Sequence, residues 1–312
     1  MILAAGLTPA WQQIMSFRRL DLGEVNRAAE VHWCASGKAI NVGMALAALD
    51  VPAHTLSPAG GWSGQAMRAE FAERQLPATW TPTATATRVC TTLLNGADGA
   101  ATELVENAAA LTEAELSHFA TRYHDLIGRA NFAVLTGSLP TGTPPTFYQA
   151  LLEQPKCPVL LDARGPELLA ALAGKPRVVK PNREELALTV GRPLTDRAAV
   201  LSAMRELIAR GAQSVIVTAG NDAVFVMEGT QAWELTPPTV TPVVNPIGCG
   251  DCLAAGVAWG LCRGDSLVDA VRLGMAMAAD NVTQLLPARL SPARVDALHK
   301  ALRNNDQGAS SS

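Results

Sequence analysis

The chain has 312 residues, of which 48% are hydrophobic and 17% are charged. This length and composition suit one large α/β domain, or two smaller ones, with a sizeable buried core. The net charge of −3 at pH 7 supplies no positive field to hold nucleic acid or an anionic membrane, so we expect neither as a partner. Any phosphate must then be bound by local donors in particular loops.

The N-terminal sequence MILAAGLTPA lacks the basic leader of a secretory signal. The most apolar later run, Cys252 to Cys262, is much shorter than the ~18 residues that suggest a membrane span. The six cysteines are scattered, so we expect no disulfide framework. These features predict a cytoplasmic protein.

Two stretches in the first third of the chain have a strand-like pattern. Residues 11–34 are of mixed polarity, and residues 80–107 contain TATATRVCTTLLN before a turn with glycine and aspartate. Such patterns are typical of β-hairpins. Each stretch is too small for a core of its own, so we expect the two to form a small sheet over one edge of the main domain, as a lid.

From about residue 130, short apolar runs alternate with amphipathic helical segments. This alternation predicts a parallel sheet with helices on both faces. The expected strands are 132–137, 158–162, 177–181 and 214–220. The expected helices are 112–129, opened by a capping box of Thr112 and Glu115, then 182–190, 196–210, 251–263, 265–281 and 291–303. We expect one domain over residues 1–303 and a polar, disordered tail at 304–312.

The segment NPIGCGD, residues 245–251, carries the strongest signal of a functional site. Gly248 and Gly250 allow the backbone to turn its N–H groups toward one point, where the following helix adds the positive end of its dipole. Such a nest suits a phosphoryl group that gathers negative charge during transfer. Asp251 is placed to take a proton from an attacking hydroxyl, although an ordinary N-cap explains it equally well on the motif alone.

Three further features are weaker when taken singly. ASGKAINVG at 35–43 starts a helix with Lys38 and Asn41, and a solvated helix entry also accounts for it. TGSLP at 136–140 ends a buried strand with small polar residues, the usual position of a ligand loop in an open α/β sheet. Arg88 lies in the expected lid hairpin, where a solvated edge residue is the simpler interpretation.

VKPNREEL at 179–186 leaves a strand and places Asn182 and Glu185 three residues apart. A capping box explains this pair. A carboxylate and an amide at this point also suit a hydrated magnesium ion near phosphates. Both interpretations are open from the sequence.

Cys249 and Cys252 lie three residues apart at a helix start. The helix dipole favours a lowered thiol pKa, so reversible oxidation of the pair is one hypothesis. Packing of two small residues in a tight turn is the other. A structural zinc site lacks support, because it needs four ligands and there is no second close pair.

Taken in order, these segments resemble the ribokinase-like (PfkB) carbohydrate kinase family, closest to its 1-phosphofructokinase and tagatose-6-phosphate kinase branch. The resemblance runs through LTPAWQ (7–12), GEVNRA (23–28), ASGKAINV, TRVCTTLL, TGSLP, VKPNREEL and NPIGCGD. It implies a three-layer α/β/α sandwich with a small β-sheet lid that often pairs two subunits. It also implies an ATP-dependent kinase that uses Mg²⁺ and in some members a monovalent cation such as K⁺.

The resemblance further implies a role for each matching residue. Asp251 matches the catalytic base, and Gly248, Cys249 and Gly250 match the anion hole. The positions matching substrate contacts are Gln12, Gly37, Lys38, Asn41, Arg88 and Ser138, with Lys38 and Arg88 as clamps for a phosphate of the sugar. The positions matching nucleotide contacts are Lys180, Asn182, Glu185, Thr218, Gly220 and Asn281, of which Asn182 and Glu185 organise the metal through water.

This chain departs from the family pattern at several positions. Gln12 stands where an aspartate usually grips sugar hydroxyls, Pro246 stands near the usual threonine, and GNDAVFV lacks a second glycine after Gly220. The resemblance implies that the acceptor is a phosphosugar of the fructose 1-phosphate, fructose 6-phosphate or tagatose 6-phosphate type, while Gln12 leaves the identity of the sugar open. A kinase for an unphosphorylated sugar, sugar acid or nucleoside is the alternative, and a catalytically silent sugar- or nucleotide-binding regulator is an alternative of another class.

Overall fold

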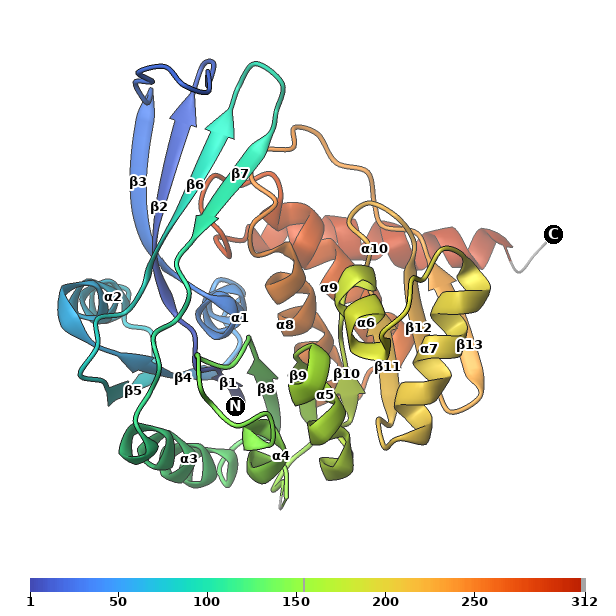
Figure 1. Ribbon diagram of the computed structural model, residues 1–312. Coiled ribbons are helices and arrows are strands. Elements are labelled where there is room, and N and C mark those ends of the chain that lie inside the picture. Colours follow the sequence, from blue (N-terminus) through green and yellow to red (C-terminus); the bar gives the residue numbers. More distant parts are fainter. Residues whose placement is uncertain (154, 310–312) are drawn as a thin grey trace.

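The computed structural model describes residues 1–153 and 155–309 (Figure 1). Within these residues the main sheet has nine strands. From edge to edge they are β13 (Gln231–Leu235), β12 (Val224–Glu228), β11 (Ser214–Val217), β10 (Val178–Val179), β9 (Val159–Asp162), β8 (Phe132–Thr136), β1 (Ile2–Ala5), β4 (Ala53–Ala59) and β5 (Ala78–Pro82). The strands from β11 to β5 are parallel, and their carboxyl ends lie at one edge of the sheet.

Two cores lie on opposite faces of this sheet, because successive side chains of a strand point to opposite sides. In β1, Ile2 and Ala4 enter one core and Leu3 and Ala5 enter the other. The first core is covered by α1 (Lys38–Ala47), α2 (Gly61–Glu73), α8 (Cys249–Cys262), α9 (Leu267–Asn281) and α10 (Pro292–Ala309). The second is covered by α3 (Glu113–Ile127), α4 (Phe147–Leu151), α5 (Gly165–Ala171), the 3₁₀ turn Leu172–Gly174, α6 (Arg183–Val190) and α7 (Arg197–Ala209). The predicted three-layer α/β/α arrangement is confirmed.

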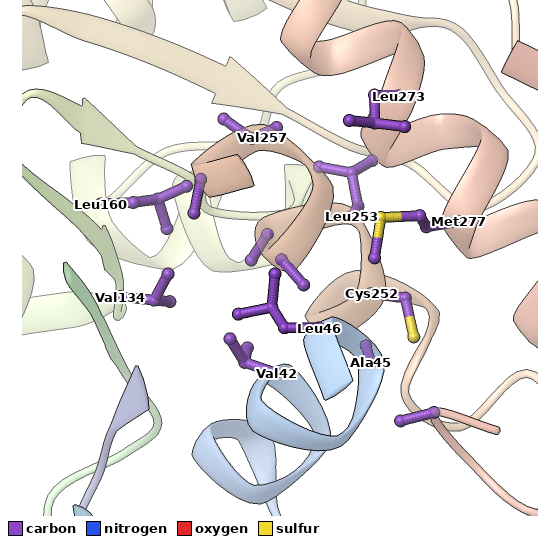
Figure 2. Packing of buried hydrophobic residues seen from close by; sticks show 14 of the residues in the cluster. Val42, Ala45, Leu46, Val134, Leu160, Cys252, Leu253, Val257, Leu273 and Met277 are labelled. Carbon is purple, nitrogen blue, oxygen red and sulfur yellow. The ribbon is translucent and has the colours of Figure 1, made fainter. Parts of the chain in front are cut away.

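Helices α1 and α8 carry Lys38 and Asp251, and they are held together in the first core. Figure 2 shows Val42 and Leu46 of α1 beside the turns of α8. On its other side α8 approaches α9 so closely that a Cβ on Gly256 would fall 2.5 Å from the Cα of Gly274. This packing sets the position of the amino-terminal end of α8 relative to α1.

A second sheet has the strand order β3-β2-β6-β7 and stands above the main body in Figure 1. Its strands are β2 (Ala10–Phe17), β3 (Glu30–Ser36), β6 (Val89–Asn95) and β7 (Ala101–Val105). Ile14, Cys34 and Leu94 on one face pack against Leu285 and Leu286 of the main body. The prediction of a small lid sheet is confirmed, but its boundary at residue 80 is wrong. Strand β5 pairs in parallel with β4 and belongs to the main sheet.

The predicted strands of the main sheet are parallel, but one edge has two further strands that the sequence analysis did not predict. Strands β12 and β13 are antiparallel, because only Gly229 and Thr230 separate them and so short a turn cannot make a parallel crossover. The predicted helices are all present, and the capping box of Thr112 and Glu115 opens α3 as expected. None of the helices in the described ranges is both long and apolar enough to cross a membrane.

The chain also stays helical further than predicted. Helix α10 continues to Ala309, so residues 304–309 are helical and not part of a disordered tail. That boundary was predicted from the loss of apolar periodicity, whereas a helix already formed adds a backbone hydrogen bond with each further residue. Residues 310–312 of the predicted tail lie outside the described residues.

Candidate active site

A cleft of about 470 Å³ lies between the lid and the carboxyl ends of the parallel strands. Strands β8 to β11 each deliver polar residues to it where they end. The predicted site residues that line it are Gln12, Gly37, Lys38, Asn41, Arg88, Ser138, Lys180, Asn182, Glu185, Thr218, Gly248, Gly250 and Asp251. These residues come from segments spread over most of the chain, so the fold brings together most of the predicted site.

A second, mostly apolar cavity of about 230 Å³ adjoins the cleft and shares Thr218, Pro246 and Gly250 with it. Gly220 and Cys249, both predicted site residues, line this second cavity and not the cleft. Its remaining lining is Asn221, Val224, Pro237, Pro238, Val240, Leu253, Met275, Ala278, Ala279 and Val282. The two cavities together provide a polar chamber joined to an apolar one across the glycine loop.

The glycine loop, for which an anion-binding nest is predicted, leads directly into α8. Gly248 is the N-cap of α8 with φ +85°, a left-handed conformation that favours glycine. Among the residues that the structure describes, the amides of Gly248 and Gly250 have no hydrogen-bond acceptor. Helix α8 begins at Cys249, two residues before the predicted start, so Asp251 lies inside its first turn. The N-cap interpretation of Asp251 is therefore wrong.

Asp251 is buried, with 7% of its surface exposed, and it lines the cleft. Asn41 Nδ2 of α1 donates a 2.7 Å hydrogen bond to Asp251 Oδ2, while Oδ1 has no partner in the described part of the chain. Burial raises the pKa of Asp251 to about 6, against the opposing effect of Lys38. Asp251 is therefore a carboxylate at neutral pH whose proton affinity suits a general base.

Asp162, at the end of β9, is a site residue that the sequence analysis missed. Lys38 Nζ lies 3.1 Å from its Oδ1, and Lys180 Nζ lies 3.2 Å from its Oδ2. Burial alone would raise the pKa of Asp162, but the two ammonium groups outweigh it and hold the pKa below the usual value. The sequence did offer a signal for Asp162. It is a carboxylate at the end of a predicted strand, and that strand lies next to the one that leads into TGSLP.

Asn182 and Glu185 form the capping box at the start of α6. Asn182 Oδ1 accepts from the Glu185 amide at 2.7 Å, and Glu185 Oε2 accepts from the Asn182 amide at 2.9 Å. The second oxygen of Glu185 faces the cleft, 3.4 Å from Lys38 Nζ. Burial would lower the pKa of Lys38, but Asp162 and Glu185 outweigh it and raise that pKa.

These carboxylates present hard oxygen ligands of the kind that Mg²⁺ prefers. Asp162 Oδ2 accepts no hydrogen bond, although Lys180 lies near it, and Glu185 Oε1 meets only Lys38. Over residues 1–153 and 155–309, no group of three or more His, Cys, Asp and Glu side chains is arranged to hold a metal alone. The residues present therefore fit a Mg²⁺ ion that keeps water and phosphate oxygens as its other ligands.

Gln12 and Arg88 join the lid to the cleft. Gln12 is 2% exposed, and its amide Nε2 donates to Thr92 Oγ1 at 2.7 Å. The guanidinium of Arg88 donates to three backbone carbonyls, those of Thr8, Pro9 and Glu106, at 3.0–3.2 Å. Two of its five N–H groups remain for a ligand.

Glu103 of β7 is a second residue that the sequence analysis missed. Its side chain lines the cleft from the lid, on the same face of the sheet as Gln12 and Cys90. Burial raises the pKa of Glu103, and Arg88 opposes that rise. The strand alternation within 80–107 carried this signal, because it decides which side chains of a hairpin face the main body.

Gly37 must be glycine for a steric reason. It is the N-cap of α1 with φ +104°, and a Cβ there would fall 2.9 Å from the Cα of Pro9. The chain before α1 therefore runs directly against the loop that leads into β2. Ser138 faces this region from the loop after β8, where the amide of Gly137 donates to the carbonyl of Asp162 at 3.0 Å.

Asn281, for which the resemblance implies a nucleotide contact, is fully buried and lines neither cavity. Its Nδ2 donates to the carbonyl of Ile247 at 2.9 Å and lies 3.3 Å from Cys249 Sγ. Its Oδ1 accepts from the amide of Ala288 at 2.6 Å. The side chain thus supports the glycine loop from behind, through contacts that sequence spacing does not reveal.

Cys249 and Cys252 are free thiols. Burial raises the pKa of Cys249 to about 11 and raises that of Cys252 as well. The prediction that the helix dipole lowers these pKa values is wrong, because the cost of burying a thiolate outweighs the dipole. The packing interpretation is the one that fits the structure.

Comparison with known proteins agrees with this fold. A model of the pfkB family carbohydrate kinases matches residues 9–294. Phosphofructokinase-2 from Escherichia coli in complex with fructose 6-phosphate has 26% identity and a TM-score of 0.86, over 97% of this chain and 100% of that chain. Its complex with potassium has 25% identity and a TM-score of 0.88 over the same shares. A possible 1-phosphofructokinase from Thermotoga maritima, 19% identical, has the same fold, with a TM-score of 0.86 over 96% and 97% of the two chains.

The layers, the lid and the cleft at the strand ends define a ribokinase-like sugar kinase. The chain belongs to the pfkB family of carbohydrate kinases. It is an ATP-dependent sugar kinase, and the family uses a divalent metal together with ATP.

Proposed function

We propose that the protein transfers the terminal phosphoryl group of ATP to a hydroxyl of a sugar phosphate, with Asp251 as the catalytic base. The observation that carries this proposal is the position of Asp251. A buried carboxylate with one free oxygen lies in the turn that also presents the unpartnered amides of Gly248 and Gly250. A base and an anion-binding nest within one helical turn suit phosphoryl transfer to a hydroxyl.

The chemical step is an in-line displacement. The acceptor's hydroxyl oxygen attacks the terminal phosphorus of ATP, the bond from that phosphorus to the bridging oxygen of ADP breaks, and the hydroxyl proton passes to Asp251 Oδ1. Asn41 holds the other carboxylate oxygen at 2.7 Å and so fixes the direction of the free one. The nest amides donate to the phosphoryl oxygens as their charge rises.

The apolar cavity next to the cleft suits the base of ATP. Val224, Val240 and Met275 offer it apolar contact, and Gly220 leaves room for the backbone to approach. The phosphates then extend past Thr218 and Gly250 into the polar cleft, toward Lys180. Along this route the terminal phosphate of ATP would lie at the nest.

Mg²⁺ would be held through Glu185, Asp162 and Asn182, directly or through water, and would neutralise charge on the phosphates. Lys180 and Lys38 keep Asp162 ionised for that purpose, because they hold its pKa below the usual value. The potassium complex of the E. coli relative supports a test for a monovalent requirement, by comparing K⁺ with Na⁺ at constant ionic strength.

The acceptor would lie under the lid, in contact with Gln12, Gly37, Asn41 and Ser138. The fructose 6-phosphate complex of the E. coli relative supports a phosphosugar. One observation favours the second candidate, a kinase for an unphosphorylated sugar. Lys38 already meets two carboxylates, and Arg88 already donates to three carbonyls and keeps only two N–H groups for a ligand, so each is only partly available to a second phosphate.

The outer face of the lid suits a second copy of the chain, which extends the proposal to a homodimer. Val31, Trp33 and Leu104 are 46%, 42% and 55% exposed on this face, opposite the cleft. Trp33 stacks on Trp11 with ring centroids 6.2 Å apart, which gives a rigid apolar surface. Trp33→Glu should convert a dimer to a monomer by light scattering, and a wild-type monomer would contradict this part.

The proposal is tested with a panel of sugars and sugar phosphates, scored by ADP release and by the product's phosphate position. Turnover is expected for a phosphosugar and is lost in Asp251→Asn. Turnover of an unphosphorylated sugar, sugar acid or nucleoside alone would support the second candidate. ATP binding without turnover of any compound on the panel would support the other alternative, a catalytically silent sugar- or nucleotide-binding regulator.

A further inference from the structure

Four cationic side chains line the cleft: Lys38, Arg88, Arg164 and Lys180. Lys38 and Lys180 share the carboxylate of Asp162, and Lys38 also meets Glu185. Arg88 donates three hydrogen bonds to backbone carbonyls. The two lysines are therefore paired with carboxylates, and Arg88 has only two N–H groups left for a ligand.

Arg164 differs from the other three. Its side chain makes no hydrogen bond or ion pair within the described residues, and the residue is exposed at the cleft. The motifs in the sequence give it no role, because it follows Asp162 by two residues and lies outside all of them. All five N–H donors of its guanidinium are available to a ligand.

The backbone that carries Arg164 is nevertheless fixed. Arg164 directly precedes α5, where its carbonyl accepts from the amide of Leu168 at 3.4 Å. The next amide, that of Gly165, donates to Thr189 Oγ1 of α6 at 2.8 Å. Because the backbone is fixed and the guanidinium has no partner, Arg164 can bind an anion without first breaking a hydrogen bond or an ion pair.

We propose that Arg164 is the phosphate-binding cation of the cleft, and that its guanidinium donates two parallel hydrogen bonds to the oxygens of one phosphoryl group. The planar fork of an arginine matches phosphate in this way, whereas a lysine supplies only a point charge. Lys38 would have to leave Asp162 or Glu185 to do the same. The loop of Arg164 lies between that of Ser138 and that of Asn182, since β9 lies between β8 and β10 in the sheet.

This inference rests on the proposed function for the source of the phosphate, which is either the acceptor's own phosphate or the terminal phosphate of ATP. The two sources give different kinetic results. If Arg164 binds the acceptor's phosphate, losing its guanidinium raises KM for the phosphosugar. KM for ATP and the turnover of unphosphorylated sugars then stay unchanged. If Arg164 binds the terminal phosphate of ATP, losing its guanidinium lowers kcat or raises KM for ATP with every acceptor.

The test compares Arg164→Gln and Arg164→Lys with Arg205→Gln, a control that removes the same charge from an exposed position of α7. Arg164→Gln should lose roughly 10- to 100-fold in kcat/KM, as expected for charge-assisted hydrogen bonds. Arg164→Lys should recover only part of this loss, because it restores charge without the bidentate geometry. Arg205→Gln should behave as wild type. Equal kinetics for Arg164→Gln and wild type would overturn the proposal.

A binding measurement separates this inference from the proposed function. Titration calorimetry with ATP and with inorganic phosphate needs no turnover. If wild type phosphorylates no sugar but Arg164→Gln still weakens binding of either probe about tenfold or more, the proposed function fails and the role of Arg164 stands. If the variant binds both probes and every phosphorylated acceptor as wild type does, the role of Arg164 fails and the kinase assignment is untouched.

Discussion

Asn41 Nδ2 donates a 2.7 Å hydrogen bond to Asp251 Oδ2, joining residues 210 positions apart in the sequence. Both residues lie near the amino-terminal ends of helices, α1 and α8, that pack on one face of the main sheet. The bond holds one carboxylate oxygen and leaves the other free. The core packing of these two helices is therefore what sets the direction of the proposed base.

Asp251→Asn should lower kcat by at least about 100-fold, because the amide keeps the shape of the carboxylate but cannot accept the proton. ATP binding by calorimetry should stay within about twofold of wild type. Asp296→Asn, an exposed position of α10, is the matched control and should keep full turnover. Near-normal turnover in Asp251→Asn would remove Asp251 from the role of base.

Asn41→Ala should shift the acidic limb of the pH profile of kcat/KM to higher pH. The hydrogen bond from Asn41 lowers the pKa of Asp251, so its loss raises that pKa further. Ser63→Ala removes the hydrogen bond of another buried side chain, to the carbonyl of Thr87, and controls for a general loss of stability. An unchanged acidic limb in Asn41→Ala would show that Asn41 does not act through the base.

The pH dependence of stability should distinguish Asp251→Asn from wild type. Burial raises the pKa of Asp251 from 3.8 to about 6, so the folded state holds its proton more tightly than the unfolded state does. The stability that this proton provides is present below pH 3.8 and is lost as the pH rises through 6. Asp251→Asn avoids this loss and should be more stable than wild type by up to about 3 kcal/mol at pH 8.

Denaturant titrations at pH 8 and pH 5 check this expectation. The advantage of Asp251→Asn over wild type should shrink at pH 5, where the wild-type carboxyl is mostly protonated. A variant that is equally or less stable than wild type at pH 8 would mean that the buried carboxylate carries no such penalty.

Asp162→Asn should destabilise the fold by about 3 kcal/mol or more at pH 7, because it leaves the buried ammonium of Lys180 without its carboxylate. Lys180→Met alone should also destabilise the fold, because it leaves the buried carboxylate of Asp162 with Lys38 as its only cationic partner. The double variant should be more stable than the sum of the two single losses predicts. Additive losses in urea titrations would show that the two residues are not coupled.

Wild type should resist mild peroxide at neutral pH as well as Cys249→Ala does. The pKa of Cys249 is about 11 and that of Cys252 is raised too, so little of either thiol is present as the reactive thiolate. Activity before and after peroxide, with mass analysis of the peptide that contains both cysteines, checks this. A disulfide between them that dithiothreitol reverses would show that the loop opens enough to expose both sulfurs.

Local patterns in the sequence predicted the elements whose causes are local. The glycines at 248 and 250, the capping box of Asn182 and Glu185, and the alternation after residue 130 each depend on neighbours a few positions away. A left-handed turn, a helix cap and a buried strand are decided over that range, so these features are where the sequence placed them.

The tertiary structure alone decided the long-range partners of the polar groups in the cleft. Arg88 donates to carbonyls up to 80 positions away, Lys38 meets Asp162 across 124 positions, and Asn281 supports the loop at Ile247. The pKa of a buried group follows the same rule, since burial and the charges around it come from the whole fold. Sequence therefore determined the chemistry available to this sugar kinase, and packing determined which side chains are used in holding the site and which, like Arg164, are left free to bind.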